Sequence, residues 1–384
     1  MDAPTSLGIP RAFQSLADPR RANHTHRLID ILTLALVAVL GGAEDWVNVA
    51  VYARSKQAWL KTFLDLPTVI PSHDTFNRLF ARLDPDAFEA CFRQWTATLA
   101  DLSGGKLVAL DGKTLRSSFA HAWDQSGPGA PGVSAFVQAN HLVFAQEKTD
   151  GKGQELSAIK KLLQVLDLTG AVVTIDALGC QKEVAQLIVD AKADYLLQVK
   201  DNQPTLKAQL ATLFGEAALE KYQGWTHATC TTVDGDHGRL ETREAHVLWD
   251  VQHLGALAGE WAGLRSVALI RRTRDLIGAD GRRQVRTENH YYISSFNRRR
   301  KAETFLACSR GHWSVENNLH WQLDVSFHED QRRLHKGHGA ENFSRLNRIA
   351  LTLLKKETTR KVGIATKRNL CGWDNDYLLK VLAG

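Results

Sequence analysis

The sequence predicts a mixed α/β protein, in which an all-helical N-terminal domain precedes a larger domain with a mixed sheet flanked by helices. Three observations lead to this prediction. Apolar residues recur at helical spacing through the first 100 residues, and short buried-strand runs begin only after Ser103-Gly104-Gly105. A stretch of period-two alternation then interrupts the second region. We therefore expect a helical domain over 1–102 and an α/β domain over 103–384 with a β-rich insertion at about 225–300.

The N-terminal region contains clear helix boundaries. An apolar helix over 27–40 ends at Gly41-Gly42, and a second helical stretch covers 44–64. Ser72 suits the N-cap of a helix over 73–83, and Asp84-Pro85 begins another. Two helices joined by a short turn also occur in helix-turn-helix domains that bind DNA. This region is therefore either an ordinary helical bundle or a domain that binds DNA ends.

The second region begins with strands and continues with alternating helices and strands. Expected strands cover 106–110, two runs within 133–146, 171–175 and 195–199, and expected helices cover 155–168, 181–191 and 205–221. The period-two runs fill 225–296, after which helices return at 302 to about 325 and at 342–356. This order is typical of a mixed sheet with helical layers.

Composition excludes several classes of protein. The chain has 384 residues, 44% hydrophobic and 23% charged, which is typical of globular domains and not of disordered or collagen-like chains. Its five cysteines are scattered without a C-x-x-C pair, which favours a reducing compartment. No signal peptide is visible, and the most apolar stretch, 31–40, is shorter than the roughly 20 residues that span a bilayer. We expect a soluble cytoplasmic protein without a membrane partner.

The positive charge is concentrated in two blocks. The formal net charge is only +6, but residues 265–301 hold 11 Lys and Arg against 3 Asp and Glu, and residues 331–368 hold 11 against 2. Such blocks suit a polyanion, because neutralising phosphates dominates non-specific binding to nucleic acid. Either block alone could instead be a solvated surface. The DNA contacts expected from the second block are Arg332, Arg333, Arg345 and Arg348.

Two aspartates share one sequence context. Asp111 and Asp176 each follow a short, mostly apolar run that reads as a strand (KLVAL and AVVTI), and carboxyl ends of strands are where open sheets present ligand-binding groups. An Asp after a strand is also a common turn residue. A third acid, Glu316, lies in the expected helix after 302, where α-helical spacing would place His312, Glu316 and His320 on one stripe.

Several motifs together resemble one protein family. The segments DGKTLRSS, TIDALGCQ, YLLQVKDNQPTL and RGHWSVENNLHWQLDVSFHEDQRR are similar to those of DDE transposases of bacterial insertion sequences, and more narrowly to the H-repeat-associated branch. The segment IPSHDTFNRLFARLDP resembles the N-terminal associated region of that branch. The resemblance implies a ribonuclease-H-like catalytic domain with a β-rich insertion between the second Asp and the Glu. It also implies that Asp111, Asp176 and Glu316 form the catalytic and metal-binding triad.

The resemblance further implies what such a site acts on. The partners would be double-stranded DNA at the inverted-repeat ends of the element and at the target. The protein would bind them as a homo-oligomer, in the cytoplasm of a bacterium and in association with the nucleoid. The cofactor would be Mg²⁺ or Mn²⁺, in two copies, since paired divalent ions stabilise the attacking and leaving oxygens of phosphoryl transfer. Mg²⁺ prefers oxygen ligands, which the three carboxylates supply.

Other basic side chains near the acids are expected to contact phosphate. Two positions depart from the superfamily pattern, because His312 and Leu323 stand where an Arg and a Lys are usual. The expected DNA contacts around the site are Lys113, Arg116, Lys200, Arg310, His312 and His320.

Two alternatives remain open at this stage. One is a zinc hydrolase that uses His312, Glu316 and His320, although it would leave Asp111 and Asp176 without a role. The other is a catalytically decayed, transposon-derived protein that binds DNA without cutting it.

Overall fold

A computed structural model describes residues 13–22, 24–66, 69–99, 106–115, 130–138, 142–148, 154–236, 239–277, 283–332, 334 and 336–383. The chain divides into two compact units, each built from segments that are distant in sequence. Unit 1 comprises Met1–Asp101, Gly112–Ala158 and Glu316–Gly384, and unit 2 comprises Leu102–Asp111 and Ile159–Val315. The chain therefore passes back and forth between the units.

Unit 2 contains a mixed sheet. Its three parallel strands are β1 (Leu107–Leu115, which continues into unit 1 after Asp111), β4 (Val172–Ile175) and β5 (Asp194–Val199). Four antiparallel strands follow in the order β9, β8, β7, β6, with bounds Arg283–Ser294, Ser266–Ile277, Arg239–Leu248 and His227–Asp236. The predicted mixed sheet and the β-rich insertion are confirmed.

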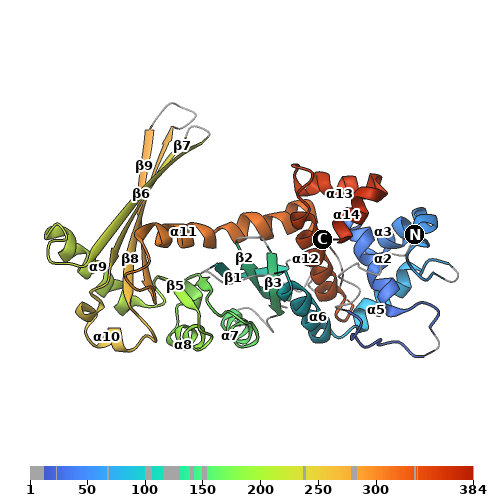
Figure 1. The fold of residues 1–384 in the computed structure, drawn as a ribbon, viewed down its shortest axis with the longest axis horizontal. Coiled ribbons are helices and arrows are strands. Elements are labelled where there is room, and N and C mark those ends of the chain that lie inside the picture. The colour runs from blue at the N-terminus through green and yellow to red at the C-terminus, as the bar shows by residue number, and fades with distance from the viewer. Residues whose placement is uncertain are drawn as a thin grey trace, which may run out of the picture. The chain divides into compact units, whose positions relative to one another are not determined.

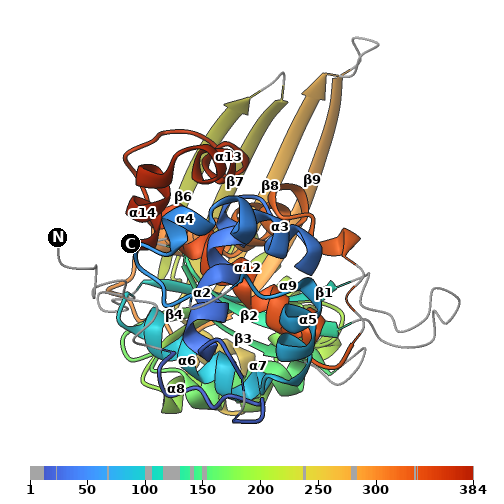
Figure 2. The ribbon, with the colours of Figure 1, turned by 90° about the vertical axis from the view of Figure 1, so that its right-hand side faces the viewer.

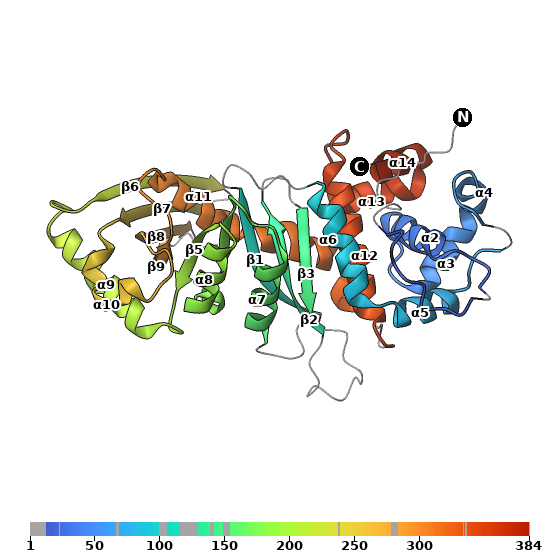
Figure 3. The same cartoon turned by 60° about the horizontal axis from the view of Figure 1, so that its bottom comes forward.

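Helices cover both faces of this sheet. On one face α11 (Ala302–His312) packs Phe305, Leu306 and Cys308 into a core with strand residues. The other face carries α8 (Lys182–Asp190), whose Val184 and Ile188 are buried (Figures 1 and 3). The remaining unit 2 elements are η1 (Ala177–Gly179), α9 (Pro204–Leu219), η2 (Val251–Leu254) and α10 (Ala256–Gly259), while α7 (Glu155–Val165) begins in unit 1.

Unit 1 is mainly helical. Its N-terminal helices are α2 (Leu28–Leu40), α3 (Trp46–Ser55), α4 (Gln57–Leu60), α5 (His73–Arg82) and α6 (Pro85–Ala97). Its C-terminal helices are α12 (Gly339–Lys356), α13 (Ile364–Trp373) and α14 (Asn375–Ala383). A hairpin of β2 (Ala130–Val137) and β3 (Leu142–Lys148) completes the unit. The predicted helical N-terminal region is confirmed.

The C-terminal helix α12 lies at the centre of unit 1 and packs against α2, α5 and α6 (Figure 2). Trp46 stacks on Phe80 at 4.5 Å between ring centroids and meets Phe343 of α12 edge-on at 4.7 Å. The expected caps are present, because the Ser72 side chain accepts from the backbone N–H of Thr75. None of the helices in the described ranges is long and apolar enough to cross a membrane.

The predicted helical stretch from 302 to about 325 is present, but its second half is not regular α-helix. The α-helix α11 ends at His312, and η3 (Glu316–His320) and η4 (Gln322–Ser326) are π-helical, followed by the short 3₁₀ helix η5 (Glu329–Gln331). A π-helix has i→i+5 hydrogen bonds, so Glu316 and His320 lie in a wider turn than the α-helical prediction assumed. His312 is buried whereas Glu316 is exposed, so these two side chains differ in environment.

Candidate active site

Asp111 and Asp176 both follow the last paired residues of two neighbouring parallel strands in unit 2: Asp176 comes directly after β4, and Asp111 lies within β1 where its pairing with β4 ends. Leu110 of β1 pairs in register with Ile175 of β4, so the residue after each is an aspartate at the same edge of the sheet. Adjacent strands are about 4.8 Å apart, which brings the two backbones as close as separate strands come. Both aspartates are half-buried. The register thus presents two carboxylates together at this edge.

The loop that follows Asp176 is held by side-chain amides. Asp176 Oδ1 accepts a hydrogen bond from the N–H of Leu178 at 3.1 Å. Asn202 Nδ2 donates to the carbonyl of Ala177 at 2.6 Å, and Gln203 Nε2 donates to that of Cys180 at 3.0 Å. Sequence analysis assigned no role to these two amides, although the YLLQVKDNQPTL segment contained them. They position the loop that carries the second aspartate.

His312, the last residue of α11, lies against β4 on the face of the sheet that α11 covers. Its Nδ1 lies 3.2 Å from Thr174 Oγ1, two residues before Asp176, and only 9% of the residue is exposed. Burial lowers the pKa of His312 to about 4, against the opposing effect of Asp176, so the imidazole is neutral near pH 7. The expectation that His312 contacts DNA phosphate is therefore wrong, because a buried neutral ring is neither accessible nor cationic. It instead ties α11 to β4.

Glu316 is the first residue of η3 in unit 1 and is exposed. In the same unit, Lys355 Nζ donates to the carbonyl of Asn318 at 2.5 Å and lies 5.4 Å from the centroid of the Phe136 ring. Burial lowers the pKa of this lysine to about 7. Lys355 thus fastens the π-helix that carries Glu316 to α12, a contact that no sequence pattern indicated.

The three acids do not form a cluster that could be recognised as a metal site. Among the described residues, no group of three or more His, Cys, Asp or Glu side chains could hold a metal ion. Asp111 and Asp176 belong to unit 2, and Glu316 begins the last segment of unit 1. The two strand-end carboxylates are oxygen donors of the kind that Mg²⁺ and Mn²⁺ accept. The complete triad and its ions stay a prediction.

Comparison with known families shows which family this chain belongs to. The family model for the transposase DDE domain matches residues 102–353. The chain belongs to the DDE transposase family. A second model, for the region associated with this DDE domain, matches residues 11–96 of this family member.

Relatives of this DDE family member place it in the predicted branch. The H repeat-associated protein YhhI of Escherichia coli is 36% identical over 362 residues, covering 94% of this chain and 93% of YhhI. An uncharacterized protein from the dhlA 3′ region of Xanthobacter autotrophicus is 41% identical over 288 residues, covering 74% of this chain and 92% of that protein. The inactive transposase YbfQ of E. coli is 37% identical over 57 residues, covering 15% of this chain and 68% of YbfQ.

Among solved structures, the piggyBac transposase synaptic complex with hairpin DNA matches 98% of this chain and 76% of its own, with a TM-score of 0.38 and 11% identity. The assignment to the DDE family therefore rests on the family models and the curated relatives.

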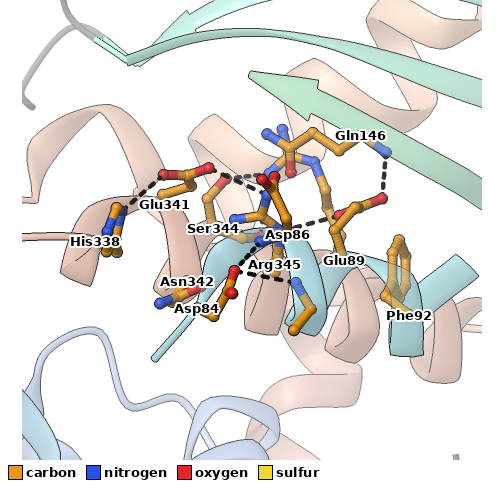
Figure 4. A network of polar contacts seen from close by, with 12 residues as sticks. Asp84, Asp86, Glu89, Phe92, Gln146, His338, Glu341, Asn342, Ser344 and Arg345 are labelled. Carbon is orange, nitrogen blue, oxygen red and sulfur yellow. Dashed lines mark hydrogen bonds and ion pairs between the residues drawn. The ribbon is translucent and has the colours of Figure 1, made fainter. Parts of the chain in front are cut away.

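In this DDE family member, two arginines expected to bind DNA are instead buried (Figure 4 shows Arg345). Arg345 is 2% exposed and donates from Nε to Glu89 at 2.9 Å and from Nη2 to Glu341 at 3.2 Å. Arg348 is 1% exposed and donates from Nη1 to Glu329 at 3.2 Å. The expectation that Arg345 and Arg348 contact DNA is wrong, because their guanidinium groups are neutralised inside unit 1.

Arg332 is also occupied within unit 1. It donates to the carbonyl of Phe327, its guanidinium lies 4.2 Å from the centroid of the Phe343 ring, and burial lowers its pKa to about 10. Arg332 is half-buried and so less enclosed than Arg345, but its guanidinium is engaged within unit 1. Arg116, Arg333 and the side chain of Lys113 lie outside the described residues.

Three other expected DNA contacts remain at least partly accessible. Lys200, directly after β5, is exposed, and His320 in η3 is half-buried. Arg310 of α11 is 48% exposed and pairs with Asp234 at 3.0 Å.

Proposed function

We propose that this chain is a DNA transposase of an insertion sequence. It would bind the terminal inverted repeats and catalyse metal-dependent cleavage and strand transfer, with Asp111, Asp176 and Glu316 as the acidic residues. One observation carries the proposal: within the matched DDE domain, Asp111 and Asp176 directly follow the last register pair of two parallel strands, Leu110 and Ile175. The DGKTLRSS and TIDALGCQ motifs supply these two residues.

The carboxylates would hold two divalent ions, Mg²⁺ or Mn²⁺. Such ions would stabilise the charge that develops in phosphoryl transfer. The chain's own residues orient the acids. Asn202 and Gln203 fix the loop after β4, and His312 holds the end of α11 against that strand. Because His312 is neutral near pH 7, it adds no positive charge that would compete for the carboxylates.

Accessible basic residues would hold the substrate beside this edge. Lys200, Arg310 and His320 are proposed phosphate contacts, as are Lys113, Arg116 and Arg333 from sequence alone. Such contacts would place double-stranded DNA against a centre whose carboxylates otherwise repel it. Assembly as a homo-oligomer on paired DNA ends, in the bacterial cytoplasm, belongs to the same proposal.

A second candidate is a decayed relative that binds DNA without cutting it, which the similarity to the inactive transposase YbfQ favours. The zinc alternative has no comparable support. His312 is buried against Thr174 while Glu316 is exposed, and the described residues contain no group of three or more His, Cys, Asp or Glu side chains that could hold a metal ion.

Cleavage of DNA that contains the inverted repeats flanking the gene separates the two candidates. The wild-type protein should cut this duplex in the presence of Mg²⁺ or Mn²⁺, and Asp176→Asn should abolish cutting while leaving binding intact. The matched control is Asp190→Asn, which removes an exposed carboxylate at the end of α8. Binding without cleavage by the wild-type protein would favour the decayed relative, and cleavage by Asp176→Asn would end the assignment of that residue.

A further inference from the structure

The β-rich insertion projects beyond the edge of the sheet at which the two aspartates lie. Strand β9 runs antiparallel to β5 and pairs with it only from Val199↔Tyr291 to Leu196↔Ser294. Residues 283–290 of β9 therefore continue past the carboxyl end of β5, accompanied by their partners on β8. We call this extension the arm, comprising residues 231–236 of β6, 239–244 of β7, 271–277 of β8 and 283–290 of β9 (Figure 1).

One face of the arm continues the face of the sheet that α11 covers. Near the body of unit 2, Ala245, Ile270 and Tyr292 pack with α11. Side chains alternate between faces along a strand, so every second residue outward shares this surface. Beyond the helix the surface is charged, and its members are Glu241 and Arg243 on β7, Arg272 and Arg274 on β8, and Arg286 and Glu288 on β9.

Arginines on this face crowd around a single buried carboxylate. Glu241 is 3% exposed, with Arg243 Nη2 at 2.8 Å, Arg274 Nε at 3.7 Å and Arg272 Nε at 3.8 Å from its Oε1. A guanidinium has five N–H donors, so three of them around one carboxylate bring more donors than its two oxygens can accept. Asp234 and Glu288 on the same face also pair with Arg243 and Arg272, so four arginines face three carboxylates and the face keeps a small excess of positive charge.

The strand register also opposes like charges. Arg243 of β7 is the direct partner of Arg272 of β8, and Arg274 of β8 is the direct partner of Arg286 of β9. Like charges directly across a sheet are destabilising. Two such pairs on one face are what a surface built to receive an anion would contain, since bound phosphate would relieve the repulsion.

The end of α11 links this face to the aspartate edge. Arg310 pairs with Asp234 of the arm at 3.0 Å, and Asp234 also pairs with Arg243 at 2.6 Å. Two residues later, His312 contacts Thr174 at the end of β4. One helical turn therefore contacts both the arginine face and the strand that presents Asp176.

We propose that the arginine face of the arm, formed by Arg243, Arg272, Arg274 and Arg286, binds the phosphate backbone of duplex DNA and guides it to the aspartate edge. This inference rests on the proposed function and names the surface that serves it. Arginine forks suit phosphate oxygens, and their spacing on neighbouring strands suits a chain of phosphates. The arm face would thus supply the contacts that Arg345 and Arg348, buried in unit 1, cannot make.

The test compares two double variants of the full-length protein that remove equal charge from opposite faces of the same two strands. Arg274→Gln/Arg286→Gln alters the proposed face. Arg271→Gln/Arg283→Gln alters the other face, where these arginines are 44% and 73% exposed. Affinity for a duplex carrying the flanking inverted repeats is measured without metal over a series of salt concentrations, and circular dichroism verifies folding.

The first variant should lower the slope of log affinity against log salt by about two units, close to one unit for each phosphate that the protein no longer neutralises. The control should leave the slope unchanged. An unchanged slope in the first variant would overturn the proposal, and so would equal changes in both, since that would mean diffuse attraction without a preferred face.

The outcome can be separated from the fate of the proposed function. Cleavage by Asp176→Asn tests only whether Asp176 is catalytic. The salt slopes are measured without metal, so they test only whether the arm binds DNA phosphate. Loss of cleavage in Asp176→Asn together with an unchanged slope in Arg274→Gln/Arg286→Gln would overturn the arm proposal alone.

Discussion

Replacing Arg345 with methionine tests whether the second basic block is structural or binds DNA. The side chain bridges Glu89 of α6 and Glu341 of α12, and Glu89 also accepts the N–H of Gln146 in β3 at 2.7 Å (Figure 4). Methionine fills most of the volume but removes the charge, so two carboxylates, 4% and 8% exposed, lose their shared cation. Removing one partner of a buried ion pair costs about 3–5 kcal/mol. We expect a loss of that size in the free energy of unfolding.

The destabilisation should depend on pH. Burial raises the pKa of Glu89 even beside Arg345, and removing the cation raises it further. A carboxyl with a folded pKa above its unfolded value binds extra protons when folded, so its contribution to stability falls as pH rises. The variant should therefore lose more stability at pH 8 than at pH 5.

Urea unfolding followed by circular dichroism measures the effect, with Arg360→Met as the control. Arg360 belongs to the same basic block but is exposed, so its replacement should change stability by no more than about 0.5 kcal/mol. The salt slope of DNA binding should be unchanged in folded Arg345→Met protein. A stability loss below about 1 kcal/mol combined with a reduced salt slope would refute the reasoning, because Arg345 would then face DNA.

Three further changes probe unit 2. A Cβ at Gly179 would lie 2.2 Å from Ile175 Cγ2, so Gly179→Ala should lower the free energy of unfolding by about 1–3 kcal/mol, measured by thermal unfolding, and reduce cleavage. The control is Gly215→Ala, which should be neutral or stabilising because a Cβ there would meet no atom within 4 Å. Equal effects of the two substitutions would contradict the clash at Gly179. Asn202→Ala should lower kcat for cleavage more than it raises KM, because it frees the loop after β4; a change confined to KM would argue against positioning. Burial holds the pKa of His312 near 4 instead of 6.5, so the stability that neutral His312 contributes is present above pH 6.5 and is lost as pH falls toward 4. His312→Asn should reduce this change in the free energy of unfolding by up to about 3 kcal/mol. An identical pH profile of stability in the variant would exclude a buried, neutral His312 as its source.

Features that depend on local sequence were predictable. The strand end before Asp176 follows from a short apolar run, although β1 continues past Asp111 to Leu115, and the caps at Ser72 and Asp84 follow from residue type. Such strands and caps are determined by residues within a few positions of one another, so the local sequence predicts them directly. The mixed sheet and the insertion followed from their order.

Features that depend on distant partners were not predictable. Counting charges assigns Arg345 to a basic surface, but its carboxylate partner Glu89 lies 256 residues earlier. The π-helical turns that begin at Glu316 have no distinct periodicity signal over so few residues, so the sequence predicted regular α-helix there. The amide of Asn202 acts across a loop from a different strand, which a motif alone does not show.

The discontinuous construction of unit 1 has a consequence for the chain during its synthesis. Helices α2, α5 and α6 leave the ribosome early, but α12, which packs among them, emerges only after the whole of unit 2. Until then, apolar faces and the carboxylate of Glu89 lack their final partners, so the nascent helices would depend on chaperones or on interim contacts. A premature stop codon anywhere before Gly339 would remove α12 entirely and leave unit 1 without its central helix, even with Asp111 and Asp176 still present.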